Sequence, residues 1–179
     1  MKVINLSEQP SLLNQYLKEL RSVEIQKDSM RFRHNIERIG ELMAVEISKH
    51  LTYATEQVQT PLAVATMQVL QDQVVLGTVL RAGLPMHQGF LNMFDHAENA
   101  FVSAYRKEVE DIQGNTQLEI VSEYLAAPSL EGKTLILVDP MLATGGSAVA
   151  AIDACKKRGY KNIRLMCLVG VPEGVKTVE

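Results

Sequence analysis

The sequence lacks tryptophan, has only two cysteines and contains no long uninterrupted apolar segment. No stretch reaches the roughly 18 apolar residues that a membrane-spanning helix requires. Near the N-terminus, Glu8, Gln9 and Pro10 interrupt the apolar residues, and no small-residue cleavage site follows, which argues against a signal peptide. We therefore expect a cytoplasmic, soluble protein with no membrane partner.

The cysteines do not indicate a metal site or a disulfide framework. Cys155 falls in a predicted helix and Cys167 in an apolar strand, and neither has a metal ligand at a useful spacing. Free cysteine is commonly buried, so both are interpreted as reduced, buried thiols. We expect no metal site built from protein ligands alone.

Basic residues are not in excess. There are 18 Lys and Arg against 21 Asp and Glu, a formal net charge of −3, and the basic residues are dispersed along the chain. This argues against a nucleic-acid partner, whereas a small anionic substrate would need only local arginines. With 179 residues and 46% hydrophobic content, we expect one domain over residues 1–179.

The first half of the chain combines a helix pattern with strand patterns. Apolar residues recur every three or four positions from Met30 to Leu51, which predicts a long scaffold helix. Alternation between Glu56 and Leu70, broken at Thr60 and Pro61, predicts two short strands joined by a turn. The β-branched run from Val74 to Leu80 is typical of a strand buried on both faces of a parallel sheet.

The later segments extend this α/β pattern. Gly83 and Pro85 mark a turn and the start of a helix, on whose surface we expect His87. The runs "AFVSAYRKEV" and "LEIVSEYL", separated by Gly114 and Asn115, predict a projecting antiparallel hairpin.

A βαβ unit closes the sequence. A strand over Thr134–Val138 is followed by a helix from about Ala148 to Lys157, for which Gly159 is the stop signal. A second strand follows over Ile163–Val169. The sequence therefore predicts an α/β fold with a parallel sheet.

The loop from Asp139 to Ser147 is the strongest functional motif. It follows a predicted parallel strand and precedes a helix, where unpaired backbone amides and the helix dipole favour phosphate. Gly145 and Gly146 allow close approach, and Thr144 and Ser147 add hydroxyl donors. The lysine of a Walker A loop and the three glycines of a dinucleotide fingerprint are both absent. Asp139 can accept hydrogen bonds from hydroxyls, so the loop fits a sugar phosphate.

The string "LVDPMLATGGSA" resembles the phosphoribosyl-diphosphate signature of type I phosphoribosyltransferases. Its Asp-Pro-Met form is similar to that of uracil phosphoribosyltransferases, since other members usually carry a second acid where Pro140 stands. The segments "VLRAGLPMHQGFL", "AYRKE" and "CLVGVPEGV" resemble further family segments in the family's order. The resemblance spans about residue 30 to the C-terminus. It implies a Rossmann-like parallel sheet with an antiparallel hairpin hood over the reacting centre.

The resemblance implies transfer of phosphoribosyl from 5-phosphoribosyl 1-diphosphate to uracil, giving UMP and diphosphate. Arg81, Arg106 and Asp139 are the implied catalytic residues, because guanidinium groups grip phosphate oxygens and stay ionised. The implied substrate-binding residues are Arg81, Arg106, Asp139, Pro140, Met141, Leu142, Ala143, Thr144, Gly145, Gly146 and Ser147.

The resemblance further implies a Mg²⁺ ion held mostly by substrate and water, and a homodimer or higher homo-oligomer. It also makes GTP a candidate allosteric activator.

Two other functions fit the same residues. One is a regulator of this fold that senses phosphoribosyl diphosphate and acts on RNA or a protein partner, and the other is a phosphoribosyltransferase for another base. In the family a strand and a Gly-Asp-Ala loop beyond "PEG" bind the pyrimidine, whereas this sequence ends at Glu179. We therefore expect either a longer natural chain or a protein that does not use uracil in the usual way.

Three acidic residues of the predicted hairpin are interpreted as a solvated face: Glu108, Glu110 and Asp111.

Overall fold

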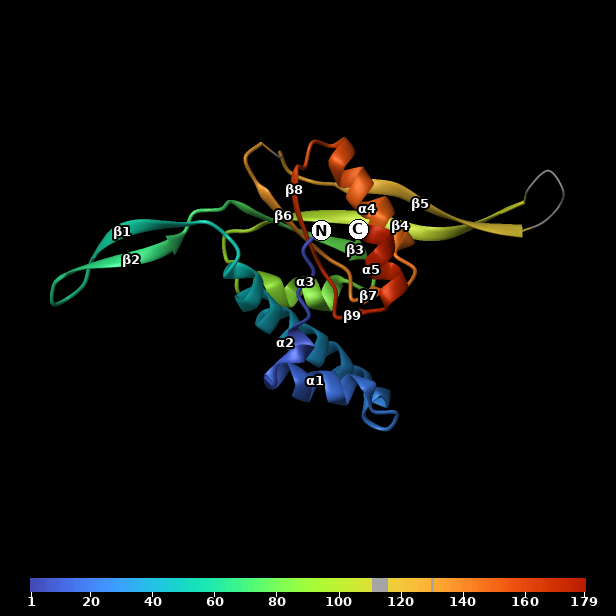
Figure 1. The fold of residues 1–179 in the computed structure, drawn as a ribbon, viewed down its shortest axis with the longest axis horizontal. Helices are drawn as coiled ribbons and strands as arrows, with labels where there is room; N and C mark the ends of the chain where they lie inside the picture. The colour runs from blue at the N-terminus through green and yellow to red at the C-terminus, as the bar shows by residue number, and fades with distance from the viewer. Residues whose placement is uncertain (111–115, 130) are drawn as a thin grey trace.

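The computed structural model describes residues 1–110, 116–129 and 131–179, and for 104–110 and 116–123 it describes the backbone alone. Its centre is a five-stranded sheet of order β5-β4-β3-β6-β8 (Figure 1). The strands are β3 (Val74–Leu80), β4 (Glu98–Glu110), β5 (Thr116–Ala126), β6 (Thr134–Val138) and β8 (Asn162–Met166). β4, β3, β6 and β8 are parallel, and β5 is antiparallel to β4. The predicted α/β fold with a mostly parallel sheet is confirmed.

Helices cover both faces of this sheet. On one face, α2 (Ser29–Ser48) and α3 (Leu84–Leu91) pack against side chains of β3 and β6. On the other face, α4 (Gly146–Lys157) packs through Ala151 and Cys155. Every residue of β6 is buried, as expected for a central parallel strand covered on both sides.

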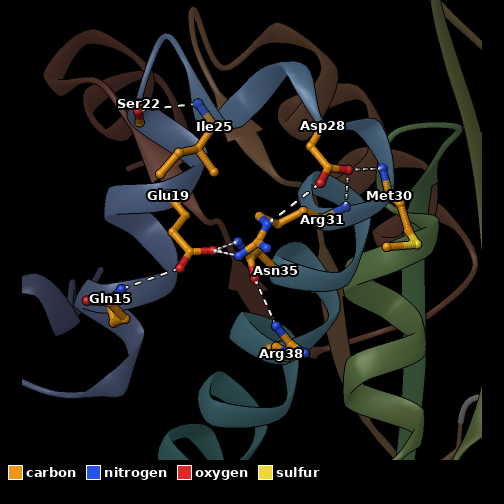
Figure 2. A network of polar contacts seen from close by, with 9 residues as sticks. All are labelled: Gln15, Glu19, Ser22, Ile25, Asp28, Met30, Arg31, Asn35 and Arg38. Carbon is orange, nitrogen blue, oxygen red and sulfur yellow. Dashed lines mark hydrogen bonds and ion pairs between the residues drawn. The ribbon is translucent and has the colours of Figure 1, made fainter.

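The predicted scaffold helix is confirmed as α2, and it carries an N-terminal helix that the sequence pattern did not predict. The helix α1 (Leu12–Arg21) packs on α2, and the short 3-10 turns η1 (Leu6–Glu8) and η2 (Ile25–Lys27) flank it. Figure 2 shows the polar contacts at this junction. The buried Asn35 donates from Nδ2 to Glu19 Oε2 at 2.8 Å and accepts from Arg38 Nη1 at 3.2 Å. The bond to Glu19 joins α1 to α2, whereas the bond from Arg38 lies within α2.

Two hairpins project from the sheet in opposite directions (Figure 1). The strands β1 (Tyr53–Gln59) and β2 (Val64–Leu70) form a separate antiparallel pair, as the alternation and the Thr60 turn predicted. β4 and β5 form the second hairpin, which confirms the antiparallel pairing predicted around Gly114 and Asn115. Those two residues and Asp111 lie outside the described residues, as do the side chains of Glu108 and Glu110.

The end of the βαβ unit differs from the prediction in two respects. α4 begins at Gly146, about two residues earlier than predicted, so Ser147 lies in its first turn. β8 ends at Met166, because its partner β6 ends at Val138 and offers no further backbone groups. A short strand β9 (Val169–Gly170) then pairs with β7 (Met141–Leu142), and α5 (Pro172–Val178) follows. Cys167 therefore lies between β8 and β9, partly buried.

In the parts of the chain that the structure describes, no helix combines the length and apolar character needed to cross a bilayer.

Candidate active site

The predicted phosphate loop lies beyond the carboxyl ends of β3 and β6, where ligands bind in open parallel sheets. It borders a pocket of about 260 Å³. The lining residues are Val79, Leu80, Ala82, Asp139, Met141, Leu142, Ala143, Thr144, Gly145, Gly146, Ser147 and Ala148. Every predicted loop residue except Pro140 thus borders one cavity. Pro140 instead contributes its carbonyl oxygen, which accepts a hydrogen bond from Val169 N at 3.0 Å.

The amides at the start of α4 are free to bind a ligand. Gly145 precedes the helix with φ of 85°, a left-handed conformation that favours glycine, and no side chain caps the helix. Among the described residues, none accepts a hydrogen bond from the backbone amides of Gly146, Ser147 or Ala148, and the first such bond runs from Val149 N to Gly145 O at 2.9 Å. These donors and the helix dipole together form an anion-binding turn.

Asp139 supplies the single acidic side chain that lines this pocket among the described residues. Its N–H donates to Met166 O at 3.0 Å, which ties the residue to the end of β8. Its Oδ1 accepts from Met141 N at 3.4 Å, so the carboxyl retains further acceptor capacity. Burial raises the pKa of this carboxyl, and the Met141 hydrogen bond acts in the opposite direction.

The donor set of the pocket fits a magnesium ion held mainly by substrate. The described residues contain no group of three or more His, Cys, Asp or Glu side chains that could hold a metal. Magnesium that bridges substrate phosphates commonly takes only one or two protein carboxylates. Asp139 is the residue of the pocket that could supply one.

Arg81 is next to the pocket in the chain, although it is not one of the residues that line it. It is exposed and follows β3 directly, between Leu80 and Ala82, which both line the cavity. The turn that contains Arg81 and Gly83 packs closely on β3, because a Cβ on Gly83 would lie 2.0 Å from Thr78 Oγ1 and 2.8 Å from Val79 O. Arg106 is opposite Ile120 in the β4–β5 register, and its side chain lies outside the described residues. The role of Arg106 therefore stays a prediction.

The expectation that His87 lies on a helix surface is wrong. His87 is 4% exposed, its Nε2 is 2.7 Å from Asn99 Oδ1, and its ring centroid lies 5.5 Å from that of Phe101. Burial lowers the pKa of His87, while the Asn99 hydrogen bond acts in the opposite direction. Its place three residues before the fully buried Phe90 is the spacing that signals the inner face of α3.

Sequence reasoning also missed pocket residues outside the loop. Val79, Leu80 and Ala82 border the cavity although they come from the end of β3 and the turn behind it. The signal for them was available, since the carboxyl ends of neighbouring parallel strands meet at one sheet edge.

The sheet order and the anion-binding turn are those of the type I phosphoribosyltransferase fold. A purine phosphoribosyltransferase from Pyrococcus horikoshii has a similar fold, with a TM-score of 0.55 at 18% identity over 77% of this chain and 74% of that one. A structure of a protein from Aquifex aeolicus matches with a TM-score of 0.79 at 25% identity, over 96% of this chain and 78% of that one.

Sequence comparison defines the family within that class. The family model described as uracil phosphoribosyltransferase matches residues 7–179. A uracil phosphoribosyltransferase from Porphyromonas gingivalis is 49% identical over 176 residues, which are 98% of this chain and 80% of that protein. The chain belongs to the uracil phosphoribosyltransferase family.

Proposed function

We propose that this protein transfers the phosphoribosyl group of 5-phosphoribosyl 1-diphosphate to uracil, giving UMP and diphosphate. Membership of the uracil phosphoribosyltransferase family supports this activity. The observation that carries it is the uncapped start of α4, whose free amides lie in the same pocket as the carboxylate of Asp139. That combination suits a ligand with one phosphate ester and neighbouring sugar hydroxyls.

In the proposed complex, the amides at the start of α4 and the hydroxyls of Thr144 and Ser147 bind the 5-phosphate. Asp139 accepts hydrogen bonds from the ribose hydroxyls. The bond between C1 and the diphosphate oxygen breaks, so negative charge grows on the diphosphate. A ring nitrogen of uracil bonds to C1, and the proton that this nitrogen loses passes to solvent. Arg81, beside the pocket, and Arg106 would stabilise the diphosphate charge electrostatically.

Asp139 is the pocket acid that would hold a magnesium ion, which would supply further neutralisation of the diphosphate charge.

The test supplies the purified protein with 5-phosphoribosyl 1-diphosphate, Mg²⁺ and one base at a time, and measures nucleotide products by chromatography. We expect UMP from uracil and no product from cytosine, adenine or hypoxanthine. Asp139→Asn should lose turnover, whereas Asp153→Asn, an exposed position on α4, should keep it. If only another base gives a nucleotide, that base and not uracil is the substrate. If the protein binds 5-phosphoribosyl 1-diphosphate but transfers its phosphoribosyl group to no base, the regulator of the same fold is favoured. Adding GTP to the same assay tests the proposed activation.

We also propose that the protein functions as a homo-oligomer whose subunits meet through the β1–β2 hairpin. The segment from Thr52 to Leu70 has a single charged side chain, Glu56. Leu62 is 97% exposed and Met67 51% exposed. An isolated two-stranded hairpin is marginally stable, and uncharged edge strands invite pairing.

Light scattering checks this proposal. The unaltered protein should have at least twice the mass of one chain, and Met67→Glu should lower that mass. Val45→Glu, an exposed apolar position on α2, is the control that should leave the mass unchanged. A single-chain mass for the unaltered protein would contradict the proposal.

A further inference from the structure

The phosphate loop is hydrogen-bonded to the end of β8 and to the chain segment that follows β8. Three backbone hydrogen bonds of 3.0 Å join the two segments: Asp139 N to Met166 O, Val169 N to Pro140 O and Val171 N to Leu142 O. Within this junction, β7 of the loop pairs in parallel with β9 of the later segment. Figure 1 shows α5 continuing from this pair and lying beside α4. The first half of the loop is therefore fixed by main-chain bonds.

The second half of the loop contacts α5 closely, through backbone atoms and the side chains of Leu142 and Thr177. Gly174 is buried, and a Cβ on it would lie 2.2 Å from Ala143 O and 3.0 Å from Leu142 O. From the other side, a Cβ on Gly145 would lie 2.9 Å from Thr177 Cβ and 3.0 Å from Gly174 O. The two backbones thus interlock at a pair of glycines, and neither can take a methyl group unless one segment moves.

We propose that Gly174 is a positioning residue, which sets the direction of the free amides at the start of α4 by holding α5 against Ala143 and Gly145. The inference rests on the proposed function, because it assigns these amides to the 5-phosphate. Gly174 does not touch the substrate. A methyl group at this position forces Ala143 O away, and hydrogen bonds to a phosphate are sensitive to sub-ångström displacement of their donors.

The test compares Gly174→Ala with Gly170→Ala. The control lies four residues earlier, and a Cβ on Gly170 would meet only ordinary contacts of 3.8 to 3.9 Å with Leu142 and Val175. Calorimetry with ribose 5-phosphate measures binding without turnover, and initial rates give KM and kcat. We expect Gly174→Ala to raise the Kd for ribose 5-phosphate and the KM for 5-phosphoribosyl 1-diphosphate by about ten-fold or more. Gly170→Ala should change neither by more than about two-fold.

The affinities for ribose 5-phosphate distinguish a failure of the positioning role from a failure of the phosphate assignment. Equal affinity of both variants and the unaltered protein would overturn the positioning role while leaving the proposed function in place. Failure of the unaltered protein to bind ribose 5-phosphate would instead overturn the phosphate assignment itself.

A second variant tests the positioning role if Gly174→Ala does not fold. Thr177→Ala removes two exposed side-chain atoms: Oγ1, which donates to Glu173 O at 2.9 Å, and Cγ2, which would lie 3.1 Å from a Cβ on Gly145. The Thr177 Cβ stays in place, so the fold should tolerate the change. It should weaken ribose 5-phosphate binding about three-fold by loosening the contact. Unchanged binding in that variant would overturn the proposal.

Discussion

Arg81→Ala removes a cation beside the pocket without disturbing the fold. Arg81 is exposed, and among the described residues its side chain has no hydrogen-bond or ion-pair partner. Exposed substitutions of this kind change the free energy of unfolding by no more than about 0.5 kcal/mol. A urea titration of the variant should therefore overlay that of the unaltered protein, so any loss of rate reports on chemistry.

The expected loss of rate follows from the growing charge on the diphosphate. Removing one preorganised donor from a developing anion typically costs about 10² to 10³ in kcat. Because Arg81 is exposed to solvent, where water partly screens its charge, we expect the lower end, about 10², which corresponds to about 2.7 kcal/mol. kcat and kcat/KM should fall together, since the interaction strengthens in the transition state.

The assay is the initial rate of UMP formation at saturating uracil over a range of 5-phosphoribosyl 1-diphosphate concentrations. Arg81→Lys keeps the charge but loses the planar fork, so it should recover only part of the rate. Arg158→Ala, an exposed arginine at the far end of α4, is the matched control and should keep full activity. A rate for Arg81→Ala within about two-fold of normal would remove Arg81 from the mechanism.

Three predictions concern stability. Burial raises the pKa of Asp139, so the folded state disfavours the charged form of this carboxyl. Asp139→Asn should therefore raise the urea midpoint of unfolding near pH 7, and this gain should disappear as the pH falls to about 4. A lower midpoint near pH 7 would contradict this. Burial lowers the pKa of His87, so stability should fall as pH drops through about 6.5, and His87→Gln, followed by urea titration, should reduce that fall. An equal fall in both proteins would exclude His87 as its cause. Phe90→Ala removes a fully buried ring between α3 and the core and should cost about 3 to 5 kcal/mol by the same titration, whereas a loss below about 1 kcal/mol would show that the core collapses around the site.

The sequence by itself determined the elements whose pattern is local. The β-branched run Val74–Leu80 became a strand buried along almost its whole length, and the periodic apolar residues after Met30 became α2. The loop Asp139–Ser147 could be assigned to phosphate because a strand end, small residues and a helix start follow one another in the chain. Each of these depends on neighbours within a few residues, so composition and spacing suffice to predict it.

Only the tertiary structure decided how distant segments meet. His87 is buried because β4 supplies Asn99 and Phe101 beneath it. The pairing of β7 with β9 and the contact of Gly174 with Ala143 join residues about thirty positions apart. Such contacts arise from the packing of whole elements, in which a side chain or a carbonyl must fit against a surface formed elsewhere in the chain. No local pattern in the sequence encodes that surface.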